Sequence, residues 1–330
     1  MADLARLAGV SVATVSRALN GSAEVSIETR ERVAALAQQL NYTVNLGAKN
    51  LRTRQNRTVA VVIPYDPRSR QQVSDPFYLT MLGSLADALT ERGYDMLLSR
   101  INDDELSGAG RLYDSGQAIG VVLIGQGEHH EQLNRLAERQ VPLVVWGGQM
   151  TQQHYCSVGS DNISGGRLAT RHLLERGCKR IVFMGDPRLP EVALRLQGHQ
   201  QALAAAGMAG DPALLLPTPF AAPEAGAALN ALIDKGVPFD AVFACSDVLA
   251  MAALQVLRLH QRAVPQQVAV VGFDDIEWAS HSDPPLTTVR QPIVQAGVAI
   301  VDTLLELIAG TPALPRTLPL ELVVRQSSLR

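Results

Sequence analysis

Residues 58–64 read TVAVVIP, a short and continuous run of apolar, mostly β-branched side chains. Such a run is typical of a β-strand that is buried on both faces. Similar runs recur along the chain, separated mostly by helical stretches, at 95–99 (DMLLS), 120–125 (GVVLIG), 142–146 (PLVVW), 180–185 (RIVFMG), 213–217 (ALLLP), 241–245 (AVFAC) and 268–273 (VAVVGF). Alternating strands and helices predict an α/β fold with parallel sheets and right-handed crossover connections.

The number of strands favours two lobes over one very large sheet. We expect the first lobe at about 58–158 and 286–318, and the second at about 159–285 and 319–330. The segment VQAGVAIVDTLLELIAG (294–310) predicts a helix in the second part of the first lobe. The segment LPLELVVR (318–325) predicts one last strand.

Composition excludes several classes of protein. Of the 330 residues 47% are hydrophobic and 18% charged, with a net charge of −3, which excludes wholesale disorder. Cys156, Cys178 and Cys245 are scattered, which argues against a disulfide framework or a zinc site and fits a reducing compartment. No stretch approaches the roughly 18 apolar residues of a membrane span. Asp3 and Arg6 interrupt any signal peptide, so we expect a cytoplasmic protein that does not contact membranes.

Positive charge is concentrated at the N-terminus. Residues 1–57 hold eight Arg or Lys against four Asp or Glu, whereas the remaining residues hold 21 against 28. This asymmetry suggests that only the N-terminal region meets a polyanion. Residues 46–57, LGAKNLRTRQNR, are basic and lack apolar periodicity, which predicts a linker between domains.

The sequence pattern of residues 1–45 predicts three short helices. The first, ADLARLA (2–8), stops at Gly9, and Ser11 can cap the second, VATVSRALN (12–20). Ser26 begins the third, IETRERVAALAQQLNY (27–42), whose expected buried face consists of Ile27, Val33, Leu36, Ala37 and Leu40.

The segment AGVSVATVSRALN (8–20) has the spacing of a helix-turn-helix. Val10 and Val15 would face the core, and the residues expected to face outward are Val12, Ala13, Ser16 and Arg17. An outward Arg suits guanine in the major groove, and small apolar groups suit a thymine methyl. A plain helical hairpin with a solvated Arg17 would show the same spacing.

Longer segments carry a family resemblance. AGVSVATVSRALNG and VSIETRERVAALAQQLNY resemble the DNA-binding head of the lactose-repressor (LacI/GalR) family. Later segments resemble that family in the same order: DPFY (75–78), SDNISGGRLATRHL (160–173), CKRIVFMG (178–185), ACSDVLAMAAL (244–254), VAVVGFDDIEWA (268–279) and PPLTTVRQP (284–292). The resemblance implies a small all-α helix-turn-helix head (1–45), a hinge (46–57) and a periplasmic-binding-protein-like core of two lobes (58–330).

By this resemblance, double-stranded operator DNA is the partner of the head. Base reading is implied for Val12, Ala13 and Arg17, and phosphate contacts for Thr14, Ser16 and Asn20. In the hinge, Asn45 matches the family pattern and Leu51, with Ala48 beside it, matches the apolar side chain that wedges into the minor groove. The family's usual Pro before the hinge Asn is Val44 here.

The resemblance also implies a small-molecule effector between the lobes. The implied contacts are Asp75, Phe77, Tyr78, Arg195, Phe220, Ser246, Asp247 and Asp274. Arg and Asp side chains suit sugar hydroxyls, and aromatic rings can stack on a pyranose. Trp146 and Gln126 are weaker candidates.

Structural roles would explain the same side chains. The aromatic residues could pack in the core, Asp274 could serve a cap or turn, and Arg195 could form a surface salt bridge. Asp161 is equally compatible with a structural role.

No motif of an enzyme is present: GxGxxG after a strand, GxxxxGK[ST], GxSxG and HExxH are all absent from the sequence. His129 and His130 have no ligand partner at metal spacing, so we expect neither metal nor cofactor. A ligand-controlled transcriptional regulator, most simply a sugar-responsive repressor acting as a homodimer, is therefore the favoured function. A purine-responsive regulator and a sugar-binding transport protein are the alternatives.

Overall fold

The structure is a computed structural model, and it describes residues 2–19, 22–40, 56–66, 72–127 and 130–329. The chain divides into two compact units, Met1–Asn56 and Arg57–Arg330, which we call the head and the core. None of the helices in these described ranges is both long and apolar enough to cross a bilayer.

The head consists of α1 (Ala2–Ala8), α2 (Val12–Leu19) and α3 (Ile27–Gln39). Leu4, Val15 and Val33 come from the three helices and are fully buried against one another. Gly9 ends α1 with φ of +65°, a conformation that glycine adopts without strain. The expected inner face of α3 is wrong at its ends, because Ile27 is 66% and Leu40 is 50% exposed.

The first sheet of the core holds six strands among the described residues, in the order β11-β5-β4-β3-β1-β2, all parallel. Their bounds are β1 (Thr58–Tyr65), β2 (Asp95–Asn102), β3 (Gly120–Ile124), β4 (Leu143–Trp146), β5 (Cys156–Ser160) and β11 (Arg316–Leu318). In β1, Val59, Val61 and Ile63 face one hydrophobic cluster, and Ala60 and Val62 face another. Burial on both faces explains why TVAVVIP shows no polar alternation.

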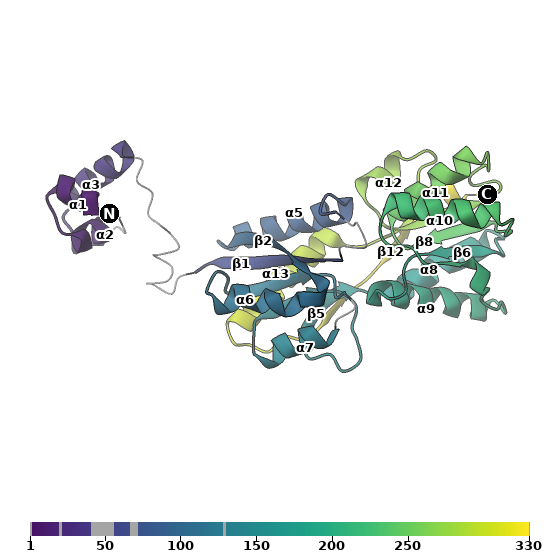
Figure 1. Ribbon diagram of the computed structural model, residues 1–330, viewed down its shortest axis with the longest axis horizontal. Helices are drawn as coiled ribbons and strands as arrows, with labels where there is room; N and C mark the ends of the chain where they lie inside the picture. Colours follow the sequence, from purple (N-terminus) through teal and green to yellow (C-terminus); the bar gives the residue numbers. More distant parts are fainter. Residues whose placement is uncertain (1, 20–21, 41–55, 67–71, 128–129, 330) are drawn as a thin grey trace. The chain divides into compact units, whose positions relative to one another are not determined.

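Helices cover both faces of this sheet (Figure 1). One cluster packs α5 (Pro76–Glu91) and α13 (Ile293–Ile308) against the sheet. The other packs the 3₁₀ helix η1 (Asp103–Gly108), α6 (Ala109–Asp114) and α7 (His130–Glu138) against the opposite face.

The second sheet also has six strands within the described ranges, in the order β12-β10-β9-β8-β6-β7. Their bounds are β6 (Ile181–Met184), β7 (Leu215–Leu216), β8 (Ala241–Ala244), β9 (Ala269–Asp274), β10 (Thr287–Arg290) and β12 (Glu321–Val323), and β12 alone of the described strands runs antiparallel. The helices of this lobe are α8 (Asn162–Glu175), α9 (Pro190–Ala205), α10 (Ala222–Asp234), α11 (Asp247–Leu259) and α12 (Glu277–His281).

The lobe boundaries differ in detail from those expected. The chain passes from one lobe to the other three times, and we call each passage a crossing; the first follows β5. β10 pairs with β9 of the second sheet, so the second crossing follows Arg290, and the expected boundary at about 286 is wrong. The expected strand at 318–325 is shorter in the structure, where β12 covers 321–323 and joins the second sheet, and a separate strand, β11, precedes it and joins the first sheet. The residues between them, Pro319 and Leu320, form the third crossing.

Helices α8 and α9 approach each other closely enough to require glycine. A Cβ added at Gly166 would overlap the carbonyl oxygen of Arg195, and one added at Gly198 would overlap that of Ile163. Because backbone atoms cannot rotate out of the way, the two glycines fix the position of α9 and of the side chains that it carries.

Candidate functional site

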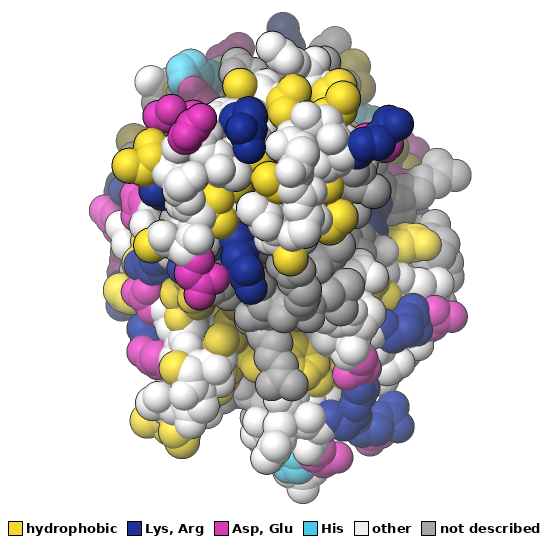
Figure 2. All heavy atoms as spheres, turned by 90° about the vertical axis from the view of Figure 1, so that its left-hand side faces the viewer, with side chains coloured by type: hydrophobic (Ala, Val, Ile, Leu, Met, Phe, Trp, Pro, Cys, Tyr) yellow, Lys and Arg dark blue, Asp and Glu magenta, His cyan; other side chains and the backbone are white. Residues whose placement is uncertain are grey.

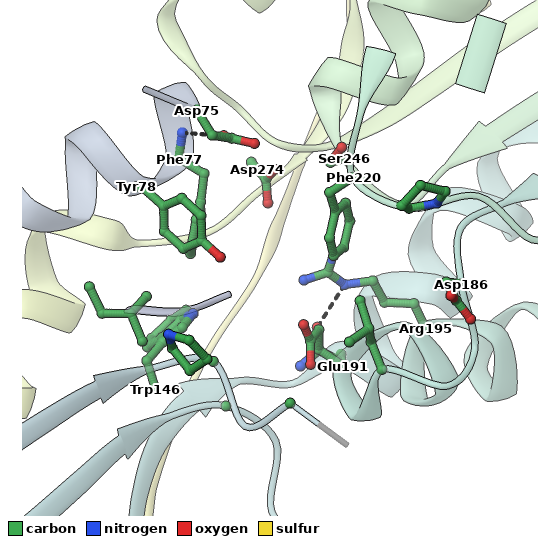
Figure 3. Close-up of a pocket in the computed structure, with 18 of the residues that line it drawn as sticks. Asp75, Phe77, Tyr78, Trp146, Asp186, Glu191, Arg195, Phe220, Ser246 and Asp274 are labelled. Atoms are coloured by element: carbon green, nitrogen blue, oxygen red, sulfur yellow. Dashed lines mark hydrogen bonds between the residues drawn. The ribbon is translucent and has the colours of Figure 1, made fainter. Parts of the chain in front are cut away.

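A cavity of about 250 Å³ lies between the two lobes of the core, at the carboxyl ends of the strands (Figure 3). Loops at this edge of parallel sheets are the usual place for ligands. Seven of the eight expected effector contacts line it: Asp75, Phe77, Tyr78, Arg195, Phe220, Ser246 and Asp274.

The first lobe contributes an aromatic wall. Asp75 caps α5, because its Oδ1 accepts from the backbone N–H of Phe77 at 2.9 Å, and Pro76 favours the first helical turn. This cap aims Phe77 and Tyr78 at the cavity, and the ring centroids of Phe77 and Trp146 are 6.4 Å apart. Trp146 lines the cavity as well, so these rings form an apolar surface rather than ordinary core packing alone.

Arg195 is the cationic centre of the second lobe. It is only 5% exposed, which overturns the alternative of a surface salt bridge. Its Nε donates to Oδ1 of Asn162 at 2.8 Å, and a terminal nitrogen donates to the carbonyl oxygen of Cys245. The guanidinium carbon lies 3.7 Å from the centroid of the Phe273 ring. Figure 3 shows the guanidinium group directed into the cavity, where it can donate to a ligand.

Asp274 is held at the end of β9 by a chain of hydrogen bonds. Gln291 Nε2 donates to its Oδ1 at 2.7 Å, and Ser160 Oγ donates to Oε1 of Gln291 at 2.8 Å. Burial raises the pKa of the Asp274 carboxyl to about 7, although the nearby charge of Arg195 opposes the rise. The N-cap of α12 is Ile276, so Asp274 does not cap that helix.

The backbone at Asp274 is strained. Asp274 has φ of +117° and Asp275 has φ of +59°, values that glycine adopts more readily. Two ion pairs hold this turn, from Asp275 to Arg290 and to Arg325, each at 2.7 Å. Strain that the surrounding structure maintains in this way is typical of functional sites.

Asp247 does not line the cavity, contrary to expectation. It is the first residue of α11, and its carboxylate is fully buried beneath the helix. There it accepts from the N–H of Ile276 at 2.9 Å and from the hydroxyl of Thr288 at 2.5 Å. It therefore ties α11 to the loop after β9 and to β10, whereas its neighbour Ser246 caps α11 at the cavity wall.

Two other candidates have structural roles. Gln126 is buried outside the cavity, where its amide donates to Gly148 O and to the Tyr155 hydroxyl. Asp161 caps α8 by accepting from the N–H of Ser164. His130 bonds Tyr155 at 2.9 Å, and no group of three acidic, His or Cys side chains in the described part of the chain could hold a metal.

Several lining residues were not predicted. They are Pro64, Asp66, Ile124, Gly125, Gly127, Gly147, Ser160, Asn162, Asp186, Arg188, Leu189, Glu191, Pro219 and Gln291. Most of them lie at the carboxyl end of a strand, in the loop that follows it or at the start of the next helix, and that position is the signal that could have found them.

The head presents a second candidate surface. Val12 is 46% exposed, Ala13 is exposed, and the Arg17 side chain is 58% exposed and pairs with Glu24 at 3.2 Å. Ser11 caps α2 by accepting from the N–H of Thr14, whose hydroxyl bonds that of Ser11. These positions agree with an outward recognition surface.

The expectation that Ser16 faces outward is wrong, because its side chain is only 7% exposed and is buried, like that of Val15, on the core side of α2. Asn20 and the hinge residues Asn45, Ala48 and Leu51 lie outside the described residues.

Charge is balanced within the described part of the head, which carries four arginines and four acidic residues. Figure 2 shows basic and acidic side chains interspersed on the face that it draws. The excess positive charge of residues 1–57 comes from Lys49, Arg52, Arg54 and Arg57. The described part of the head therefore carries no excess of positive charge.

Comparisons with known proteins agree with this geometry. Residues 1–45 match the model "Bacterial regulatory proteins, lacI family", and residues 170–328 match "Periplasmic binding protein-like domain". The HTH-type transcriptional regulator CelR of Thermobifida fusca is 39% identical over 335 residues, covering 98% of this chain and 96% of that protein.

Two solved structures extend the likeness. A transcriptional regulator CelR–cellobiose complex has a TM-score of 0.73 at 37% identity and covers 98% of both chains. The lac repressor dimer bound to operator and an anti-inducer has a TM-score of 0.85 at 24% identity, covering 99% of this chain and 98% of that one, and shows the fold. The expected fold class is thus confirmed, and the chain belongs to the LacI family of bacterial transcriptional regulators, with a helix-turn-helix head and a periplasmic-binding-protein-like core.

Proposed function

We propose that this protein represses carbohydrate-utilisation genes in the cytoplasm, and that a small neutral sugar bound between the core lobes controls its affinity for operator DNA. The observation that carries the proposal is the composition of the cavity. An aromatic wall from one lobe faces Arg195 and Asp274 of the other, which is the combination that sugar rings and hydroxyls require. The cellobiose bound in the CelR complex supports the choice of ligand class.

The switch requires a ligand that distinguishes two arrangements of the lobes, since equal affinity for both would shift nothing. A ligand that contacts both walls stabilises the arrangement in which they are close. The chain from Ser160 through Gln291 to Asp274 joins the ends of β5 and β9 across two crossings, so contact at Asp274 bears directly on the segments between the lobes.

Two copies of the chain would place one recognition helix in each half of a two-fold operator. The operator-bound dimer of the structurally similar lac repressor supports this arrangement. A pseudo-palindromic site is therefore the expected target.

Titration of the protein–DNA complex tests the proposal. The full chain selects its operator from a random duplex pool, and fluorescence anisotropy then follows the complex as cellobiose, ribose or glucose is added. We expect one of these sugars to change operator affinity by about 5- to 150-fold at fixed salt. Unchanged affinity in every sugar, with specific DNA binding intact, would contradict control by a sugar.

Removal of the exposed arginine of α2 tests the DNA-binding surface. Arg17→Ala is expected to weaken binding to the selected operator by about 1–3 kcal/mol and to relax the preference at one position of each half-site. The measurement is the affinity for a set of operators changed one base pair at a time. Arg6→Ala, which removes an exposed arginine from α1, is the control and should leave that preference unchanged. Equal loss on all sequences would mean that Arg17 contacts only phosphate.

A further inference from the structure

The cavity is markedly acidic. Among the described residues that line it, carboxyl groups outnumber guanidinium groups: the acids are Asp66, Asp75, Asp186, Glu191 and Asp274, and the bases are Arg188 and Arg195. An anionic group brought by a ligand would lie among these carboxyl groups in a partly desolvated space, where charges interact more strongly than in water.

The two guanidinium groups do not offset this excess. Arg188 is engaged by Asp186, since its Nε lies 3.0 Å from both carboxylate oxygens. Burial raises the pKa of both Glu191 and Asp274, and the single charge of Arg195 opposes that rise at both carboxyl groups. An anionic group of the ligand would therefore meet more carboxyl groups than guanidinium groups in this cavity.

Glu191 lies in the first turn of α9 and carries a buried oxygen, Oε2, with no hydrogen-bond partner among the described residues. Figure 3 shows its carboxylate and the Tyr78 hydroxyl directed into the same cavity from different lobes. The proximity is also electrostatic, because after burial the charge of Glu191 is the largest cause of the raised pKa of Tyr78. An unsatisfied buried acceptor costs free energy, which a donor on the ligand would recover.

We propose that Glu191 is a specificity-determining residue, which accepts hydrogen bonds from the hydroxyl groups of a neutral sugar and excludes sugar phosphates and sugar acids. This inference rests on the proposed function, and it narrows the class of ligand that the cavity takes. The negative charge of the carboxylate has two effects on ligand binding. It strengthens a hydrogen bond from a sugar hydroxyl, and it repels an anionic group.

Matched pairs of ligands test the inference in the full-length protein. Isothermal titration compares neutral and anionic ligands that share a sugar skeleton: cellobiitol and cellobionate, glucose and glucose 6-phosphate, and ribose and ribose 5-phosphate. Cellobiose is titrated separately. The first pair differs little in shape, so it separates the effect of charge from that of size. We expect the wild-type protein to bind the neutral member of one pair at least about ten-fold more tightly than its anionic partner.

The variant Glu191→Gln keeps the shape of the side chain but removes its charge and one acceptor. It should weaken the neutral ligand by about ten-fold or more, and it should reduce the preference for neutral over anionic ligand by a similar factor. A purely structural defect would weaken both members in proportion and leave their ratio unchanged. The control Glu131→Gln removes the same charge from an exposed first-turn position in α7 and should alter neither value.

The outcomes separate this inference from the function on which it rests. If a neutral sugar binds but Glu191→Gln leaves the ratio unchanged, the role of Glu191 is wrong and the sugar response stands. Tighter binding of an anionic member by the wild-type protein also overturns the inference. If no member of the panel binds, the sugar response itself is wrong and the role of Glu191 falls with it.

Discussion

Arg195→Ala is expected to abolish the response of the operator complex to its sugar while leaving operator binding without sugar intact. The guanidinium group directed into the cavity would be lost, and each hydrogen bond from a charged group to the ligand contributes about 1.5–3 kcal/mol. Loss of two such bonds would weaken the sugar by more than about 100-fold.

A second effect adds to the first. Arg195 holds down the pKa of Asp274, so its removal lets burial raise that pKa further above about 7. Asp274 would then be protonated at neutral pH and would lose its strength as an acceptor of ligand hydroxyls. The defect should therefore exceed that caused by the missing donors alone.

Titration of the operator complex with the active sugar measures this result. Arg195→Lys is the matched variant, since it keeps the charge but not the fork that bonds Asn162 and Cys245, and it should retain a weakened response. A wild-type response in Arg195→Ala would mean that the effector binds elsewhere. Loss of operator binding in the absence of sugar would instead show that Arg195 holds the lobes together.

Gly198→Val is expected to destabilise the core by about 3 kcal/mol or more. The new side chain would overlap the carbonyl oxygen of Ile163 and the backbone of Arg167, so α8 and α9 would have to separate. Because α9 carries Arg195 and Glu191, separation would also disturb the cavity. For a unit of this size the cost corresponds to a fall in Tm of roughly 6–12 °C.

Thermal unfolding checks this expectation, with a glycine in open space as control. Gly83 lies within α5, and a Cβ added there meets nothing within 4 Å. Gly83→Ala should therefore raise stability by about 0.5–1 kcal/mol, since alanine favours helix. A Tm for Gly198→Val within a degree of the wild-type value would mean that the two helices move apart at little cost.

The sequence predicts the two-lobe α/β architecture well, because strands buried on both faces leave continuous apolar runs. β5 escapes this rule. Its residues Cys156–Ser160 are all buried, yet they include serine and glycine, so the run is not apolar. β10 is visible as a segment, but its assignment to a sheet depends on where the crossings fall, and periodicity does not carry that information.

The candidate site shows the same division. Asp274 ends the buried strand β9 and Asp247 comes shortly after the buried strand β8, yet the carboxylate of Asp247 lies beneath α11 and that of Asp274 faces the cavity. The difference arises because Asp274 has a positive φ, whereas Asp247 is the first residue of a helix. The sequence pattern around the two residues does not reveal either backbone conformation. Glu191 has no distinguishing sequence pattern, and its significance emerges only when its unpartnered oxygen is placed against the cavity.

The three crossings also mean that neither lobe of the core can complete its sheet until the last residues of the chain have been synthesised. β11 and β12 supply an edge strand to each sheet, and both come from residues 316–323. The three described helices of the head, by contrast, end at Gln39 and have their own hydrophobic core. On the ribosome the DNA-reading unit can therefore fold long before either lobe is closed. A premature stop codon just before residue 316 would thus leave the head intact, but each sheet of the core would lack one of its edge strands.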